Sequence, residues 1–587
     1  MAQPTNPTNP DRWSAMLSRL NPVPSFSDFT GPYKVGTVDV EIPVSELDSP
    51  APAPDNAADI ETVQFRVFYP TSPEAQDKRI TWLPSPQRDH LSAYIQFLGA
   101  PSLLAQAISF LPRHLHYTSI PVVKNAPISQ PNTPNGRWPT AIFSHGLGGS
   151  RNAYSQIAGS LASHGVVVVC PEHRDGSAVA SFIRIPSQQD RFFTRSTRRA
   201  VPYLRVKHDA TDEVYALRND QLRIRLWELG LIHEAILGID KGEPLTNLNK
   251  STPSLDTFVG NLHVHMPGSI IFAGHSFGSA TMVQFLKSVF YIGHPKLEAM
   301  PEQLYVPSRQ SSICKQITSR NITILLDMWC MPLRAKSTKP LFDLPLPVYA
   351  VSPTNPMPPG GSALLAVESS DFYNWEDHLH ETARALSPDP SAPTVQATAF
   401  YKGNASGVKL AEPHFFYVER SAHLSQSDFG ILFPWLMRQV YKSEEPERAL
   451  RLNRRAILQV LRANGVPVAR TWAGDLVDGT DTGKIIVDNV SADADVAISG
   501  VHDAEAGAGA VSPAEGDGSD DRAILDRSGR SVVDAWHWID IVNMGQAEEV
   551  NEDGSNEGVA EQEPGMAGVI EPHANENTAE TATAGST

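Results

Sequence analysis

The sequence has few cysteines and no signal-peptide pattern. Its three cysteines, Cys170, Cys314 and Cys330, show no zinc-type spacing and are too few for a disulfide framework. The first 30 residues lack the basic region and the apolar core of a signal peptide, and we expect them to be a flexible N-terminal segment. These absences argue against a disulfide-stabilised secreted protein and favour an intracellular, cytoplasmic one.

The sequence also lacks a convincing membrane-spanning run. Residues 91–111 carry no formal charge and have about the length of a span, but Gly99-Ala100-Pro101 interrupts them and several serines and glutamines add polar groups. We therefore expect an apolar helical segment over 91–112 that either covers the core or lies in a lipid interface. The positions at helical spacing that could contact lipid are Leu103, Leu104, Ala107, Ile108 and Leu111.

Net charge is concentrated at one end of the chain. Residues 481–587 contain 23 acidic and 4 basic residues, a net of −19, which leaves residues 1–480 at +2 of the chain's −17. A segment so acidic and so poor in apolar residues cannot offset the entropy of ordering, so we expect 467–587 to be a largely disordered tail. An apolar island at 532–542 is either a short binding segment or an unselected hydrophobic patch. The near-neutral body predicts no nucleic-acid partner, and the tail's protein partners stay open.

A Gly-x-Ser-x-Gly pentapeptide is the strongest motif in the chain. Gly274-His275-Ser276-Phe277-Gly278 follows an apolar run at 269–273, typical of a strand, and precedes a predicted helix at 279–289. A sharp strand-to-helix turn with small residues on either side presents a serine to a base, so Ser276 is a candidate nucleophile. An ordinary turn between a strand and a helix is the alternative.

An acid and a histidine follow in the order that serine hydrolases of the α/β type use. Asp327 ends a predicted buried strand at 321–326, and His423 follows a predicted strand at 415–418. The acid would hold the imidazole in its productive tautomer. Alone, Asp327 could cap a helix and His423 could lie in a surface loop, but together and in order they favour a Ser-His-Asp triad.

A glycine-rich turn completes this set of residues. His145-Gly146-Leu147-Gly148-Gly149 follows a predicted strand at 141–144. Acyl transfer needs two backbone N–H groups directed at the developing oxyanion, and we assign them to Leu147 and Phe277. No metal or other cofactor is expected for this chemistry, and the histidine pairs elsewhere lack acid or cysteine partners at metal-ligand spacing.

These motifs and several others resemble the platelet-activating-factor acetylhydrolases, and the chain is identified as a fungal-type intracellular member of that family. The similarity spans residues 30–465 and is carried by the pentapeptide together with segments at 31–36, 143–148, 162–165, 172–178, 326–333 and 422–429. It implies an α/β-hydrolase fold for 31–466, with a mostly parallel sheet and helices on both faces. The implied activity is calcium-independent hydrolysis of short or oxidised sn-2 acyl groups of glycerophospholipids, with Ser276, Asp327 and His423 as the triad.

Three departures affect this inference. Ser279 stands where the family has a further glycine, and we expect it to crowd the contact between helix and strand. Segments 186–206 and 291–320 are longer than the family needs, which leaves the acyl-chain preference open. A broad carboxylesterase or lipase is the alternative on the same fold, and a non-catalytic interaction protein acting through its acidic tail is the second alternative. Glu172-His173-Arg174-Asp175 and the 91–111 segment favour a lipid substrate.

Overall fold

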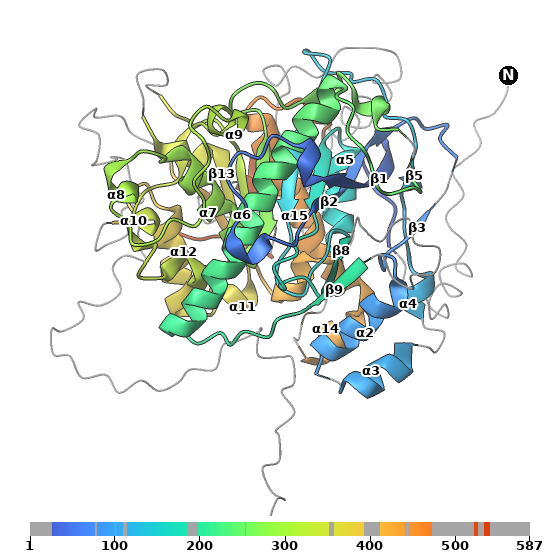
Figure 1. The fold of residues 1–587 in the computed structure, drawn as a ribbon, viewed down its shortest axis with the longest axis horizontal. Coiled ribbons are helices and arrows are strands. Elements are labelled where there is room, and N and C mark those ends of the chain that lie inside the picture. The colour runs from blue at the N-terminus through green and yellow to red at the C-terminus, as the bar shows by residue number, and fades with distance from the viewer. Residues whose placement is uncertain are drawn as a thin grey trace, which may run out of the picture.

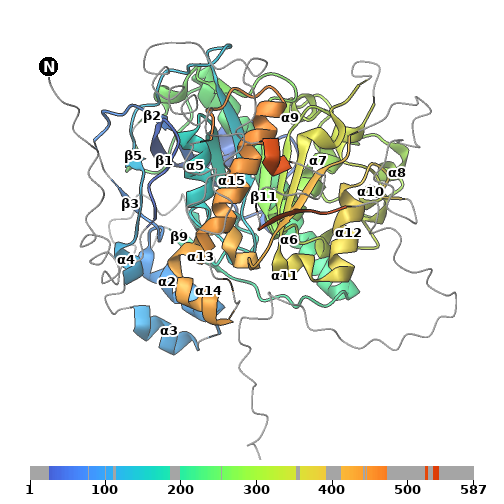
Figure 2. The same ribbon diagram turned by 180° about the vertical axis from the view of Figure 1, so that it is seen from behind.

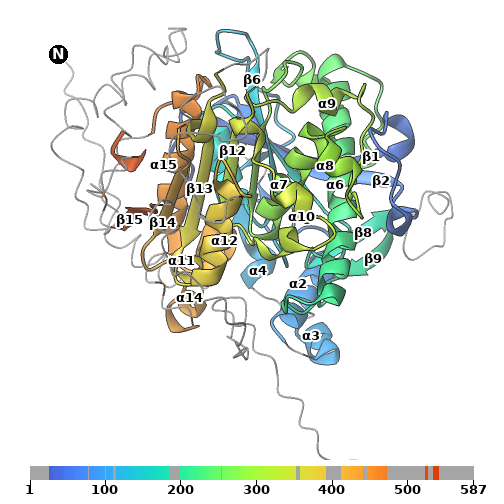
Figure 3. The same cartoon turned by 90° about the vertical axis from the view of Figure 1, so that its left-hand side faces the viewer.

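A central, mostly parallel β-sheet organises the molecule (Figures 1 and 3). The computed structural model describes residues 26–76, 79–99, 101–109, 114–184, 198–252, 254–351, 357–391, 411–440, 443, 446–471, 522–525, 533 and 535–540. Neighbouring strands are parallel from β7 through β14. In spatial order these strands are β7 (Val167–Pro171), β6 (Trp138–Ser144), β11 (Ile271–His275), β12 (Thr323–Leu326), β13 (Leu364–Ser369) and β14 (His414–Val418). They are almost entirely buried, as expected for a parallel sheet covered on both faces.

Other strands extend or flank this sheet. Beside β7, β2 (Thr62–Thr71) and β1 (Lys34–Pro43) run antiparallel, and β5 (Val123–Lys124) pairs with β1. At the other edge, β15 (Trp536–Trp538) pairs antiparallel with β14. The short β10 (Leu262–His263) pairs with β6. Two separate two-stranded antiparallel sheets pair β3 (Ile80–Thr81) with β4 (Ser119–Ile120), and β8 (Ala180–Arg184) with β9 (Arg198–Pro202).

Helices cover both faces of the sheet. One face carries α5 (Ser155–Ser163) and α15 (Pro446–Ala463), which lie in front in Figure 2. The other carries α6 (Asp212–Lys241) and α7 (Phe277–Phe290), and α6 crosses the front of Figure 1. The Thr211 hydroxyl accepts from the Val214 N–H at the start of α6, and Gly242 ends the helix at φ 74°. This two-sided covering is the α/β-hydrolase arrangement expected from the sequence.

Shorter helices surround these layers. Two of them, α2 (Gln87–Phe97) and α3 (Ser102–Ser109), lie where an apolar helical segment was expected over 91–112, and they project at the lower edge of all three views (Figures 1–3). The others are α4 (His114–Tyr117), α8 (Pro295–Glu298), α9 (Ser312–Gln316), α10 (Lys339–Phe342), α11 (Ser370–Tyr373), α12 (Glu376–Leu386), α13 (Asp428–Leu432) and α14 (Pro434–Val440). No helix in the described part of the chain is both long and apolar enough for a membrane span.

The strand order reverses between β6 and β11. From β6 the chain moves through α5 to β7 on one side, and later returns through α6 to β11 on the other side of β6. At such a switch point the loops after two neighbouring strands diverge and leave a crevice at the carboxyl ends of the strands. The glycine-rich turn after β6 and Ser276 after β11 both lie at this point.

Part of the expected C-terminal tail belongs to the folded body. Trp536 in β15 is 1% exposed, its ring stacks on Phe416, and its Nε1–H donates to the Ile524 carbonyl at 2.5 Å. The described residues of the apolar island therefore complete the sheet edge. Most of the remaining tail, and residues 186–197 of the 186–206 insertion, lie outside the described residues.

Candidate active site

The Ser276 turn has the strained geometry that the pentapeptide predicted. Ser276 adopts φ 56° and ψ −122°, between the end of β11 and the start of α7. A Cβ on Gly274 would lie 2.5 Å from the Gly278 carbonyl carbon, and one on Gly278 would lie 2.1 Å from the Ser144 oxygen. Both positions therefore require glycine. Strain of this kind is retained where the surrounding structure fixes it, and it directs the serine away from the strand.

Ser279 does not crowd the helix–strand contact as the sequence suggested. Its hydroxyl donates to the Leu326 carbonyl at 3.1 Å and lies 3.2 Å from the Leu326 N–H, which donates to it. The Ser276 N–H also donates to the Leu326 carbonyl, at 2.9 Å. The first turn of α7 is therefore bound to the last residue of β12, immediately before Asp327.

Asp327 and His423 form a direct pair beside this turn. His423 Nδ1 lies 3.0 Å from Asp327 Oδ2, and the Ser369 N–H donates to the other carboxylate oxygen. The imidazole stacks on the Phe372 ring, with centroids 4.4 Å apart and planes 5° apart. Carboxylate and ring thus fix both the tautomer and the orientation of the histidine.

The pair lies close to the serine turn. The ring centroids of His423 and His275, the residue before Ser276, are 4.5 Å apart. Ser276 is 1% exposed, and its Oγ has no hydrogen-bond partner among the described residues. The structure therefore brings the three sequence-predicted residues to one place and leaves the serine hydroxyl unpaired.

A second buried carboxyl group accompanies Asp327. Glu368 lies at the end of β13, next to the β12 end that carries Asp327, and is 1% exposed. Burial, and then the neighbouring Asp327 carboxylate, raise the pKa of Glu368 well above its ordinary value. The raised pKa favours the neutral form of Glu368, and Asp327 is the carboxyl group that pairs with His423. No sequence motif pointed to Glu368, because the strand that carries it contains none.

The glycine-rich turn packs directly against Ser276. A Cβ on Gly146 would lie 2.9 Å from the Ser276 Cβ. Gly148 has φ 67°, its N–H donates to the Ser177 carbonyl at 2.8 Å, and its Cα faces the Phe97 ring. The N–H of Phe277, at the first position of α7, has no intrahelical acceptor in an α-helix. The positions expected for two oxyanion donors, Leu147 and Phe277, therefore border the serine.

A buried ionic network lies beneath this turn. Arg225 donates to the His145 carbonyl at 2.9 Å, to Asp175 Oδ2 at 2.8 Å and to the Ser177 hydroxyl at 2.6 Å, and it lies 4.5 Å from the Phe277 ring centroid. The segment that the sequence associated with a lipid substrate supplies most of the remaining members: Glu172 pairs with Arg151, and His173 and Arg174 both pair with Glu228. These side chains are buried, so they support the turn and do not line a lipid site.

Among the described residues, one group of side chains has the spacing of a metal site. His275, Asp327 and His423 place their ligand atoms within 4.8 Å of one another. His423 Nδ1 and Asp327 already pair, and both nitrogens of His275 have hydrogen-bond partners. This arrangement fits general-base chemistry. It also shows that His275, which the sequence placed in the turn only, makes hydrogen bonds through both ring nitrogens.

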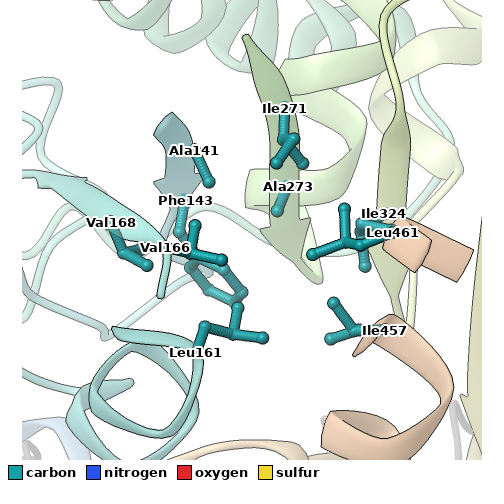
Figure 4. A pocket seen from close by; sticks show the side chains of 10 residues that line it. All are labelled: Ala141, Phe143, Leu161, Val166, Val168, Ile271, Ala273, Ile324, Ile457 and Leu461. Atoms are coloured by element: carbon teal, nitrogen blue, oxygen red, sulfur yellow. The ribbon is translucent and has the colours of Figure 1, made fainter. Parts of the chain in front are cut away.

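An apolar cavity of about 10 Å³ lies between the sheet and the α5–α15 layer (Figure 4). Ala141, Phe143, Ile271, Ala273 and Ile324 of the sheet line it, together with Leu161, Val166, Val168, Ile457 and Leu461. It offers no polar group and at most the space of one water molecule, so it is a packing gap and not a binding site.

Comparison with known proteins shows the family to which the chain belongs. The family model described as platelet-activating factor acetylhydrolase, isoform II, matches residues 21–350, which include Ser276 and Asp327 but not His423. A Schizosaccharomyces pombe protein named "Putative phospholipase A2" is 28% identical over 457 residues, covering 75% of this chain and 92% of that protein.

Mammalian relatives match a shorter region. The platelet-activating factor acetylhydrolase of Cavia porcellus is 32% identical over 256 residues, covering 44% of this chain and 51% of that protein, and the one of Canis lupus familiaris is 30% identical over 222 residues, covering 38% and 46%. Among solved structures, a ferulic acid esterase from Streptomyces cinnamoneus aligns over 75% of this chain and 92% of its own, with 14% identity and a TM-score of 0.41.

Proposed function

Because this chain belongs to the platelet-activating factor acetylhydrolase isoform II family and is a carboxylic ester hydrolase, we propose that it removes short or oxidised acyl groups from the sn-2 position of glycerophospholipids. The observation that carries the proposal is the unpaired Ser276 hydroxyl on a strained turn beside the paired His423 and Asp327. A 1-alkyl-2-acetylglycerophosphocholine is the substrate class we assign.

The mechanism follows from the roles of these groups. Ser276 Oγ attacks the ester carbonyl carbon while His423 Nε2 takes its proton, and the N–H groups of Leu147 and Phe277 stabilise the oxyanion. Collapse breaks the ester bond, and His423 returns the proton to the departing lysophospholipid oxygen. Water, deprotonated by His423, then hydrolyses the acyl-enzyme and releases the short acid. Asp327 orients His423 and stabilises its charged form.

A side-by-side assay tests the proposal. The purified protein is given a 2-acetyl phospholipid and a p-nitrophenyl ester of the same acyl group, with and without a calcium chelator. We expect phospholipid hydrolysis with the higher kcat/KM, unchanged by chelation and absent in Ser276→Ala. Nitrophenyl turnover without phospholipid turnover would instead favour a broad carboxylesterase, and loss of activity on chelation would contradict the serine mechanism.

We also propose that α2 and α3 contact the lipid–water interface. Leu98, Leu103 and Leu104 are 50%, 81% and 52% exposed, which is unusual for clustered leucines. Phe97, the last residue of α2, packs on Gly148 of the glycine-rich turn, so this apolar surface adjoins the candidate site. Ala107 and Ile108, which the sequence also assigned to this face, have side chains outside the described set, as does residue 111.

The variant Leu103→Ser with Leu104→Ser tests this surface. Each exposed leucine contributes about 1.5–3 kcal/mol when it leaves water, so we expect vesicle binding to fall by at least about 100-fold while hydrolysis of a monomeric substrate is kept. Met266→Ser is the matched control, because Met266 is 61% exposed and precedes the amino end of β11, whereas Ser276 follows its carboxyl end. A joint loss of melting temperature and monomer activity would show that the leucines are core residues.

A further inference from the structure

A chain of three hydrogen bonds connects the glycine-rich turn to the loop of His423. The Gly146 N–H donates to Tyr154 Oη at 3.1 Å. Tyr154 Oη lies 2.7 Å from His275 Nδ1, and His275 Nε2 lies 3.2 Å from the His423 backbone oxygen. Tyr154 and His275 are 5% and 2% exposed, so water does not compete for these contacts.

Donor and acceptor chemistry gives the chain one direction. A carbonyl oxygen can only accept, so His275 Nε2 carries a proton and donates it to the His423 carbonyl. In a neutral ring Nδ1 is then an acceptor, so the Tyr154 hydroxyl donates to Nδ1 while its oxygen accepts from the Gly146 N–H. Burial, and then the neighbouring His423, hold the pKa of His275 well below its ordinary value, which is consistent with this neutral tautomer.

The two ends of this hydrogen-bond chain are groups whose distances from Ser276 must stay fixed. Gly146 immediately precedes Leu147, the assigned oxyanion donor, and packs on the Ser276 Cβ. His423 is the assigned base, and its backbone belongs to a one-turn helix, His423–Gln426, after β14. His275 is the residue before Ser276. The hydrogen-bond chain from Gly146 to His423 therefore passes through the serine turn.

We infer that Tyr154 and His275 are positioning residues that hold the glycine-rich turn and the loop of His423 in fixed positions relative to Ser276. The inference rests on the proposed ester hydrolysis, because the two residues position groups of that same active site. Oxyanion donors act only within about 2.7–3.1 Å of the developing charge, and a misplacement of about 1 Å can cost about 100-fold in rate. Neither residue touches the reacting atoms in this assignment.

The first test is Tyr154→Phe, which removes one oxygen and breaks the chain. We expect kcat to fall roughly 10- to 100-fold with KM within about twofold, because the transition state loses alignment while substrate binding is kept. Labelling of Ser276 by a fluorophosphonate should slow by a similar factor. Tyr69→Phe is the matched control: its buried hydroxyl donates to the Ala126 carbonyl at 2.6 Å in the antiparallel part of the sheet. It should lower stability but not kcat.

A double-mutant cycle separates positioning from general destabilisation. Tyr154→Phe and His275→Leu break the same chain, so the double variant should be little slower than the slower single one, whereas independent structural defects would multiply. His275→Gln keeps an N–H at the end of the side chain and should retain more activity than His275→Leu. If Tyr154→Phe does not fold, this pair of His275 variants decides the question alone.

The outcomes also separate this inference from the proposed function. Wild-type kcat in Tyr154→Phe, or multiplicative effects in the double variant, would overturn the positioning role. Wild-type protein that labels at Ser276 and cleaves a nitrophenyl ester but no phospholipid would refute the substrate class, and a slowed Tyr154→Phe would still support the positioning role there. Labelling that persists in Ser276→Ala would overturn both.

Discussion

Among the described residues, buried serine, histidine and carboxylate side chains come together both beneath the glycine-rich turn and at the candidate site. In the set beneath the glycine-rich turn, Ser144 Oγ lies 2.9 Å from His173 Nε2, and His173 Nδ1 lies 2.9 Å from Glu228 Oε2. Arg225 also donates to the Ser144 hydroxyl, at 3.3 Å. Ser144 ends a regular strand, and all three residues are at most 1% exposed.

The set at the carboxyl ends of β11, β12 and β14 has the same three kinds of side chain but differs in what is left unpaired. His423 and Asp327 pair at 3.0 Å, whereas Ser276 Oγ has no partner among the described residues and its backbone is strained. A serine whose hydroxyl is fully paired stabilises its surroundings, and one that is held ready without a partner can react. The difference lies in backbone geometry and in pairing, and not in residue type.

Replacing each serine in turn should give the largest difference between the two sets. Ser276→Ala should lower kcat on the order of 10⁵-fold, because removing the nucleophile leaves only binding and oxyanion stabilisation. Ser144→Ala should keep kcat within about tenfold but lower the free energy of unfolding by about 1–3 kcal/mol, since His173 loses a buried partner. Kinetics and urea unfolding of both variants measure this. A catalytic loss in Ser144→Ala equal to that of Ser276→Ala would contradict the distinction.

The two carboxylates give the next largest contrast. Asp327→Asn should lower kcat roughly 10⁴-fold with little loss of stability, because the amide favours the wrong tautomer of His423. Glu228→Gln should instead lower the free energy of unfolding by about 3–5 kcal/mol, because Arg174 is left buried without a charged partner. Activity per folded molecule and denaturant midpoints separate the effects. If the catalytic and stability losses were exchanged between the variants, the assignment of roles would be wrong.

The third contrast is the response of stability to acid. Burial, and then the Arg225 guanidinium, hold the pKa of His173 well below its ordinary value of about 6.5, so the folded state keeps this ring neutral. Its contribution is therefore full above pH 6.5 and is lost as the pH falls below it, because the unfolded chain binds the proton more readily. His173→Asn should remove up to about 1.4 kcal/mol per pH unit from the slope of stability between pH 5 and 6.5. An unchanged slope would show that His173 is protonated in the fold.

Much of this site could be predicted from sequence because its signals are local. The strand, turn and helix around Ser276, the acid at the end of β12, and the strand before His423 all show in short windows of sequence. Strained turns with flanking glycines constrain the sequence itself, so a pattern records them.

The rest depends on contacts between distant segments. Tyr154, Phe372 and Glu368 border the site from three different elements, and no local pattern connects them to it. Glu172-His173-Arg174-Asp175 stand out in the sequence as a block, but only the fold shows that their charges are buried, with Glu172 paired to Arg151 and the other three to residues of α6. The apolar island at 532–542 could not be assigned because its partner, β14, lies over 100 residues earlier in the chain.

The docking of β15 also means that the folded enzyme could be assembled from two pieces. What holds this strand is its pairing with β14 and the burial of Trp536 against Phe416, both of which are non-covalent. A polypeptide ending near residue 480 and a synthetic peptide of residues 520–542 should therefore reconstitute the complete sheet edge on mixing, with the tryptophan fluorescence of Trp536 reporting the association. The loop of His423 follows the end of β14, so the activity of the shortened polypeptide should increase with the amount of peptide added.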